Sequence, residues 1–136
     1  MYSQWALSID DAKHIASACR ACAEQNGWNV VIAIVDEGGH TMYLERLDGT
    51  QKASSVVAQE KAKTALLFKR PTQAIEAVVA KGRHVMMMLP GATPIEGGLP
   101  LVREGQFVGA IGISGVQSHE DGVVAAAGVA HFATLC

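Results

Sequence analysis

The sequence predicts an α+β fold, an α/β sandwich in which helices flank an antiparallel sheet. Two pairs of short β-rich segments are each joined by a turn that contains glycine, so each pair is expected to form an antiparallel hairpin. Segments with a helical spacing of apolar residues precede, separate and follow these hairpins. The length of 136 residues suits one hydrophobic core. We therefore expect residues 1–136 to form a single layered domain rather than a βαβ fold.

The first helix is expected to follow Ser8 and to end at Gly27. Ser8-x-x-Asp11 has the form of a capping box, and apolar residues then recur at helical spacing. Cys19 and Cys22 lie in the middle of this helix, on its apolar stripe. A redox pair is typical of a helix start, and a zinc site needs further ligands, so both cysteines are expected to be small buried side chains.

The first hairpin and the second helix follow directly. Residues 28–35 are rich in β-branched side chains, residues 36–39 supply a turn, and residues 40–46 resume as a strand. Residues 52–69 return to helical spacing, and the sequence Arg70-Pro71 ends that helix.

A shorter helix is expected over residues 72–80. The methionine-rich residues 84–90 fit no clear class, and residues 91–100 form a loop rich in glycine and proline.

The second hairpin comprises residues 100–103 and 106–114, with its turn at residues 104–105. Glycines inside its second strand indicate that another part of the structure approaches closely. A capping sequence at residues 118–121 opens the last helix, which is rich in alanine and valine.

The composition excludes several classes of protein. Eleven basic and thirteen acidic side chains give a net charge of −2, so no basic field is present to attract nucleic acid. Hydrophobic residues make up 49% of the chain and charged residues 18%, which excludes disorder. No apolar run reaches the roughly 18 residues of a membrane span. The first residues lack the features of a signal peptide, so a cytoplasmic location is expected.

Two of the five histidines are candidate metal ligands. His14 points away from the apolar stripe of the first helix, and its neighbours on that face are small residues such as Ser17 and Ala21. This surface suits a flat ligand or a subunit contact, and an ordinary surface histidine is the alternative. His84, a weaker candidate, precedes the methionines at 86–88, which either provide a thioether ligand for iron or pack in a core or an oligomer contact.

A second group of polar residues lies at strand ends or on helix faces expected to be buried. One interpretation is a structural ion-pair network in which Asp36 or Glu60 pairs with Lys61 and Arg46. The other is a site for a small carboxylic acid, with Arg46 and Lys61 holding the carboxylate and Asp36 or Glu96 moving a proton. In that case Asp36, Lys61 and Glu96 are the candidate catalytic residues. The sequence leaves open whether the protein is an enzyme.

The ordered combination of motifs along the chain resembles the GlcG/HbpS family, which includes the C-terminal domain of PduO-type proteins. The motifs are Asp36-x-Gly38-Gly39, Arg46-x-Asp48, Glu60-Lys61-Ala62-x-Thr64-Ala65, Gly97-Gly98-x-Pro100, Gly109-x-x-Gly112-x-Ser114-Gly115, and Asp121. The resemblance implies a profilin-like fold with a five-stranded antiparallel sheet and assembly into a homo-oligomer. The framework and pocket residues it implies for ligand binding are Arg46, Lys61, Thr64, Gly97, Gly98, Pro100, Ser114 and Gly115.

The resemblance also implies binding of haem or another tetrapyrrole, and in some members a link to a catabolic operon. The main hypothesis is therefore a small oligomeric haem-binding protein, with His14 as the candidate iron ligand and His84 as the weaker one. An enzyme or binder of small carboxylic acids is the alternative. A third hypothesis is an oligomeric accessory protein with no ligand of its own.

Overall fold

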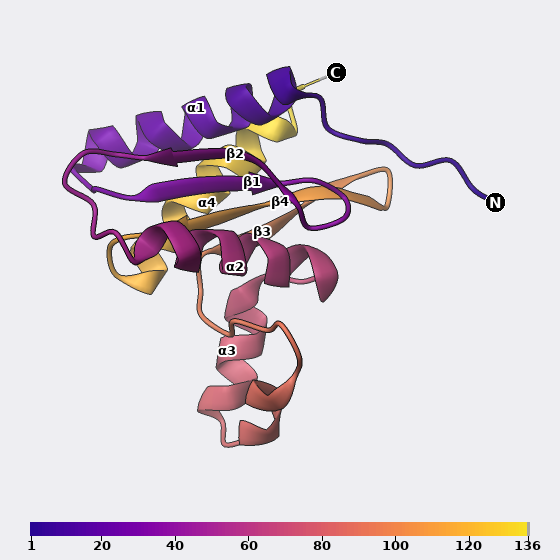
Figure 1. Cartoon of the computed structure of the whole chain (residues 1–136), viewed down its shortest axis with the longest axis vertical. Coiled ribbons are helices and arrows are strands. Elements are labelled where there is room, and N and C mark those ends of the chain that lie inside the picture. The colour runs from indigo at the N-terminus through magenta and orange to yellow at the C-terminus, as the bar shows by residue number, and fades with distance from the viewer. Residues whose placement is uncertain (136) are drawn as a thin grey trace.

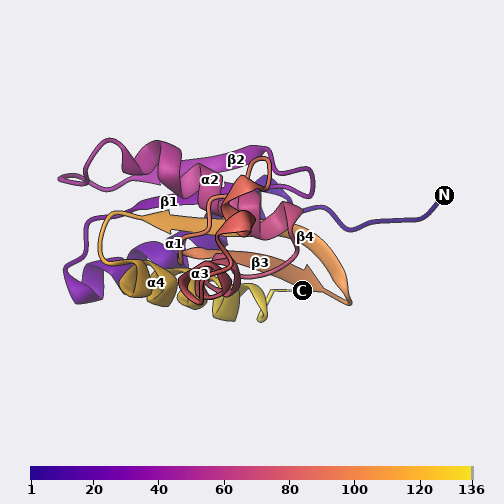
Figure 2. The ribbon, with the colours of Figure 1, turned by 90° about the horizontal axis from the view of Figure 1, so that it is seen from below.

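A four-stranded antiparallel sheet with helices on both faces makes up the body of the protein in the computed structural model, which describes residues 1–135 (Figure 1, Figure 2). The strand order is β2-β1-β4-β3. The elements in chain order are α1 (Ile9–Asn26), β1 (Val31–Val35), β2 (Thr41–Arg46), α2 (Ser54–Leu67), α3 (Thr72–Ala80), the 3₁₀ helix η1 (His84–Met88), β3 (Gly98–Arg103), β4 (Gln106–Ser114) and α4 (Ser118–Phe132). In this part of the chain, no helix combines the length and the apolarity that crossing a bilayer would require.

The expected α+β class is confirmed, but the expectation of five strands is wrong, because the two hairpins supply all four strands of the sheet in residues 1–135. The segment between α3 and β3 forms η1 and a loop. That loop contains Pro90 and Pro94, which have no amide hydrogen to donate to a neighbouring strand. Both hairpins agree with the sequence-based prediction. The turn between β3 and β4 has positive φ angles at Glu104 (53°) and Gly105 (76°), as a tight type I′ hairpin requires.

Two layers of packing flank the sheet, and they differ in the size of their side chains. On one face, α1 and α4 pack over large aliphatic residues such as Ile32 and Ile111. On the other face, α2 packs over small residues such as Ala33, with Ala58 on the helix side. Gly112 makes this second contact close, since a Cβ atom there would lie 2.6 Å from the amide nitrogen of Ala62 and in collision with the carbonyl oxygen of Ala58. Gly112 therefore serves the approach of α2, the kind of close contact that the sequence indicated for glycines in this strand.

Helix α3 and η1 project from the sandwich body (Figure 1). No residue of η1 is buried. Val85, Met87 and Met88 expose 62%, 53% and 79% of their surface, which is unusual for large apolar side chains in a sequence-local group. The expectation that these methionines belong to the core is therefore wrong, and the alternative of a subunit contact remains a prediction.

Candidate functional site

Lys61 and Asp121 form an ion pair in the interior between α2, β4 and α4. The Lys61 ammonium donates to the Asp121 carboxylate (Nζ to Oδ2, 3.1 Å) and to the carbonyl oxygen of Ile113 (3.0 Å). The other Asp121 oxygen accepts from the amide of Val116 (3.2 Å). Both charged side chains are 2% exposed. Lys61 is thus engaged inside the protein, and a ligand carboxylate would have to displace Asp121 to reach it.

The environment of Asp121 opposes its charge in part. Burial raises the pKa of this carboxyl, and the Lys61 charge and hydrogen bond and the Val116 amide lower it; the burial effect prevails and the pKa stays above its ordinary value. This balance is typical of buried ion pairs, whose desolvation penalty offsets much of their attraction. A structural ion pair of Lys61, one of the two interpretations of the sequence, is therefore present, but its partner is Asp121 and not Asp36 or Glu60.

Gly97 and Gly98 lie directly against the Lys61 segment. A Cβ atom on Gly97 would lie 2.6 Å from the carbonyl oxygen of Ile113 and 2.8 Å from the Lys61 ammonium, and one on Gly98 would collide with the Lys61 carbonyl oxygen. The hydroxyl of Thr72 accepts a hydrogen bond from the Gly98 amide (2.9 Å) and fixes the start of β3. The space next to these glycines is thus filled by α2 and α3.

The remaining pocket residues implied by the motifs also make internal contacts. The Thr64 hydroxyl donates to the Glu60 carbonyl (2.7 Å) and accepts from the Thr93 amide (2.9 Å), which ties the loop before β3 to α2. The Ser114 hydroxyl lies 3.1 Å from that of Ser54 in a buried contact. Gly115 packs against the backbone of residues 29–30.

Pro100 lies on the edge strand β3, opposite Ala110, and is partly buried.

Asp36 and Glu96 are both partly exposed, and they make different contacts. One Asp36 oxygen accepts from the amides of Gly38 (2.8 Å) and His40 (2.9 Å), which organises the turn between β1 and β2. Burial raises the Asp36 pKa, but these two backbone hydrogen bonds and the His40 charge outweigh it, so the pKa lies below its ordinary value. The Glu96 amide donates to the Glu76 carboxylate (3.3 Å), and the Glu96 side chain lies against Gly122 at the start of α4.

Arg46 is separated from the other members of the predicted carboxylate site. It is exposed at the end of the edge strand β2, opposite Val31, whereas Asp36 follows the other end of β1. The structure therefore places Arg46, Asp36 and Lys61 at three different positions.

His14 and His84 are exposed on opposite sides of the molecule. His14 lies on the outer face of α1, and His84 begins η1, at the far end of the projecting α3 segment (Figure 1). One iron atom therefore cannot take both imidazoles of one chain. Within residues 1–135, no cluster of three or more histidine, cysteine or acidic side chains is arranged to hold a metal ion.

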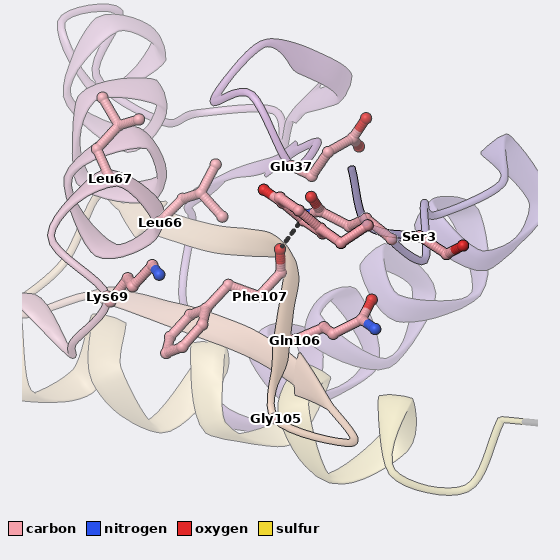
Figure 3. Close-up of a pocket in the computed structure, with 10 residues that line it drawn as sticks. Ser3, Glu37, Leu66, Leu67, Lys69, Gly105, Gln106 and Phe107 are labelled. Carbon is pink, nitrogen blue, oxygen red and sulfur yellow. Dashed lines mark hydrogen bonds between the residues drawn. The ribbon is translucent and has the colours of Figure 1, made fainter.

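A groove of about 430 Å³ contains residues that the sequence analysis missed (Figure 3). It lies between the C-terminal end of α2, the β3–β4 turn and residues 2–4, and we call it the Lys69 groove. Its lining residues are Tyr2, Ser3, Gln4, Glu37, Leu66, Leu67, Lys69, Gly105, Gln106 and Phe107. Four segments that are distant in sequence contribute to the lining, so local periodicity gave no sign of the groove. The one local signal was a lysine, rather than a glycine, just beyond the end of a helix.

The fold and these contacts define a class: small α+β sandwich proteins in which a glycine-rich sheet packs closely on a helix that carries a buried lysine. The chain matches the family model described as "Haem degrading protein HbpS-like" over residues 7–130. It is 41% identical to the protein GlcG of Escherichia coli (strain K12) over 108 residues, which is 79% of this chain and 81% of GlcG. The chain therefore belongs to the HbpS-like family, as the motifs indicated.

Two solved structures share the fold at 30% sequence identity. A double mutant of HbpS from Streptomyces reticuli superposes with a TM-score of 0.88 and covers 96% of this chain and 89% of its own. The PduOC–haem complex superposes with a TM-score of 0.85 and covers 93% of this chain and 95% of its own. These two neighbours agree with the PduO-type relationship expected from the sequence.

Proposed function

We propose that this chain is a small haem-binding protein that works as a homo-oligomer. The observation that carries the proposal is the shared fold, at 30% identity, with a relative whose structure is a complex with haem. Membership of a family described by haem degradation supports the same ligand.

His14 is the residue of this chain that best fits an axial ligand. Its imidazole is exposed on α1, and its neighbours Ser17 and Ala21 are small and exposed, so a flat macrocycle can approach the helix closely. Bound haem supplies redox chemistry at iron, and the chain supplies the coordinating nitrogen and a surface for one face of the ring.

A second chain would cover the opposite face of the ring. The helix surface around His14 is exposed and reaches only one side of a flat ligand. The projecting apolar residues Val85, Met87 and Met88 supply a surface of the kind that subunit contacts bury. Because His84 lies beside them, a contact through η1 would bring a second imidazole to the interface.

Titration with hemin tests the haem proposal. We expect a saturable Soret shift at one equivalent per chain, a changed Soret position in His14→Ala, and no change in the control His119→Ala, which removes another exposed imidazole. An unsaturable rise in absorbance, or identical spectra for His14→Ala and the parent, would overturn the assignment. Light scattering tests the assembly: Met88→Glu is expected to lower the mass, and Val123→Glu on α4 is the control.

The alternative of a small-acid site built on Arg46 and Lys61 gains no support from the geometry, since the Lys61 ammonium is paired with Asp121. A role as accessory protein of a catabolic operon stays a prediction, which the neighbouring genes would test.

A further inference from the structure

The Lys69 groove begins where α2 ends, and the helix ends in an unusual way. The Lys69 amide bonds to the Leu66 carbonyl (3.2 Å) and the Arg70 amide to the Ala65 carbonyl (3.1 Å), which is the Schellman arrangement. Lys69 occupies the left-handed position of that motif with a φ of 54°. Glycine normally fills this position because a side chain there is strained. Lysine at this position places a charged side chain at the point where the helix ends and the groove begins.

The Lys69 side chain is directed into the groove (Figure 3). Its ammonium lies 5.4 Å from the centroid of the Phe107 ring, so the aromatic face supports the charge. Within residues 1–135, the Lys69 ammonium takes part in no ion pair. Glu37, the one acidic residue of the lining, lies on the other side of the groove (Figure 3). The ammonium is therefore free to bind an anion.

The other walls of the groove combine polar side chains with an apolar part. Leu66 is 4% exposed and forms its inner wall, while Leu67 and Phe107 are more open. The N-terminal residues close one side and are tied to the hairpin by the bond from the Gln4 side chain to the Phe107 carbonyl (3.3 Å; Figure 3). The volume of about 430 Å³ falls in the range of small-molecule sites.

We propose that the Lys69 groove binds a small monocarboxylic acid with an aromatic or aliphatic body. The carboxylate pairs with the Lys69 ammonium, and the body packs on Phe107 and Leu66. The carbonyl end of α2 carries about half a negative charge, which the full positive charge of the Lys69 ammonium exceeds, so the groove suits a ligand with one negative charge. The site is separate from the helix face around His14, so this proposal does not depend on haem binding.

Phenylacetate tests the proposal by titration of the full ¹⁵N-labelled chain, with neutral phenylacetamide as the matched probe. We expect saturable shifts of the Leu66 and Phe107 amides with phenylacetate, and affinity at least about tenfold lower for phenylacetamide. Lys69→Gln is expected to lose a similar factor, whereas Lys63→Gln, on the same helix, keeps the parent affinity. Equal binding of the two probes, an unchanged affinity in Lys69→Gln, or no saturable shift in the groove would overturn the proposal.

Lys69→Gly separates binding from folding. Glycine relieves the strain at a φ of 54°, so the melting temperature is expected to stay equal or to rise while phenylacetate affinity falls. If Lys69→Gly bound phenylacetate as the parent does, the ammonium would have no part in the site. Hemin titration of Lys69→Gln is expected to match that of the parent. A failure of the Lys69 groove to bind phenylacetate can therefore be distinguished from a failure of the chain to bind haem.

Discussion

Replacing Lys61 by methionine removes one charge of the buried pair and nearly preserves side-chain volume. The substitution leaves an Asp121 oxygen and the Ile113 carbonyl without the donor that lies 3.1 Å and 3.0 Å away. Since Asp121 is 2% exposed, water cannot replace that donor. Removal of one partner of a buried ion pair costs about 3–5 kcal/mol. This is a large part of the roughly 5–15 kcal/mol that stabilises a typical domain.

The same substitution changes how stability depends on pH. The Asp121 pKa in the folded chain is already raised by burial, and Lys61 opposes that rise. A carboxyl group whose pKa is higher in the folded state than in the unfolded state binds its proton more tightly in the folded state. The stability that this proton contributes is fully present below the unfolded pKa and is lost as pH rises through the folded pKa. Without Lys61 the folded pKa rises further. Lys61→Met is therefore expected to lose more stability than the parent as pH rises above the ordinary range of a carboxyl group.

Urea unfolding followed by circular dichroism, at several pH values and one fixed protein concentration, measures both effects. The second substitution Asp121→Asn, added to Lys61→Met, is expected to restore part of the loss, because the amide oxygen still accepts from Val116 and no buried charge remains. Lys63→Met on the same helix is the control and is expected to change stability by less than about 0.5 kcal/mol. A loss below about 1 kcal/mol in Lys61→Met, or strict additivity in the double variant, would refute the reasoning.

Two further predictions concern the packing. Gly98→Ala is expected to destabilise the fold by about 1–3 kcal/mol or more, because its methyl would meet the Lys61 carbonyl and lie 2.7 Å from the Thr72 methyl; an unchanged urea midpoint would contradict this. Burial, with the nearby Cys22, raises the pKa of the Cys19 thiol to about 12, so iodoacetamide is expected to modify Cys19 only after unfolding. Peptide mass spectrometry measures how much Cys19 is modified, and modification in the folded chain at the rate of the unfolded chain would contradict this prediction.

Local features of the chain were predictable from sequence. The capping box at the start of α1 has both expected bonds, from the Asp11 amide to the Ser8 hydroxyl (3.0 Å) and from the Ser8 amide to the Asp11 carboxylate (3.2 Å). The turn at residues 104–105 likewise follows from a glycine between two segments of strand character. These features depend on residues that are close in sequence, so composition and spacing suffice.

Contacts between distant segments were not predictable in the same way. One of two interpretations for Lys61 was a structural ion pair with Asp36 or Glu60, but its partner lies 60 residues further along the chain. Helical spacing shows which face of α2 is buried and does not show which acidic residue of another element meets it. The Lys69 groove has the same character, because residues 2–4, the end of α2 and the β3–β4 turn meet only in the folded chain. The fifth strand was expected from the family resemblance rather than from any segment of this sequence.

The glycine motifs that mark the family are occupied by packing inside the chain. Gly97 and Gly98 contact Lys61 and Thr72, and Gly112 contacts Ala58 and Ala62 of α2, so no ligand fits against these backbone atoms without moving a helix. The close contact fixes α2 rigidly on the sheet, and rigid elements hold the surface groups they carry in place. The groups that we propose for binding lie instead on outer surfaces of the chain: the imidazole on α1, the projecting η1, and the ammonium at the end of α2.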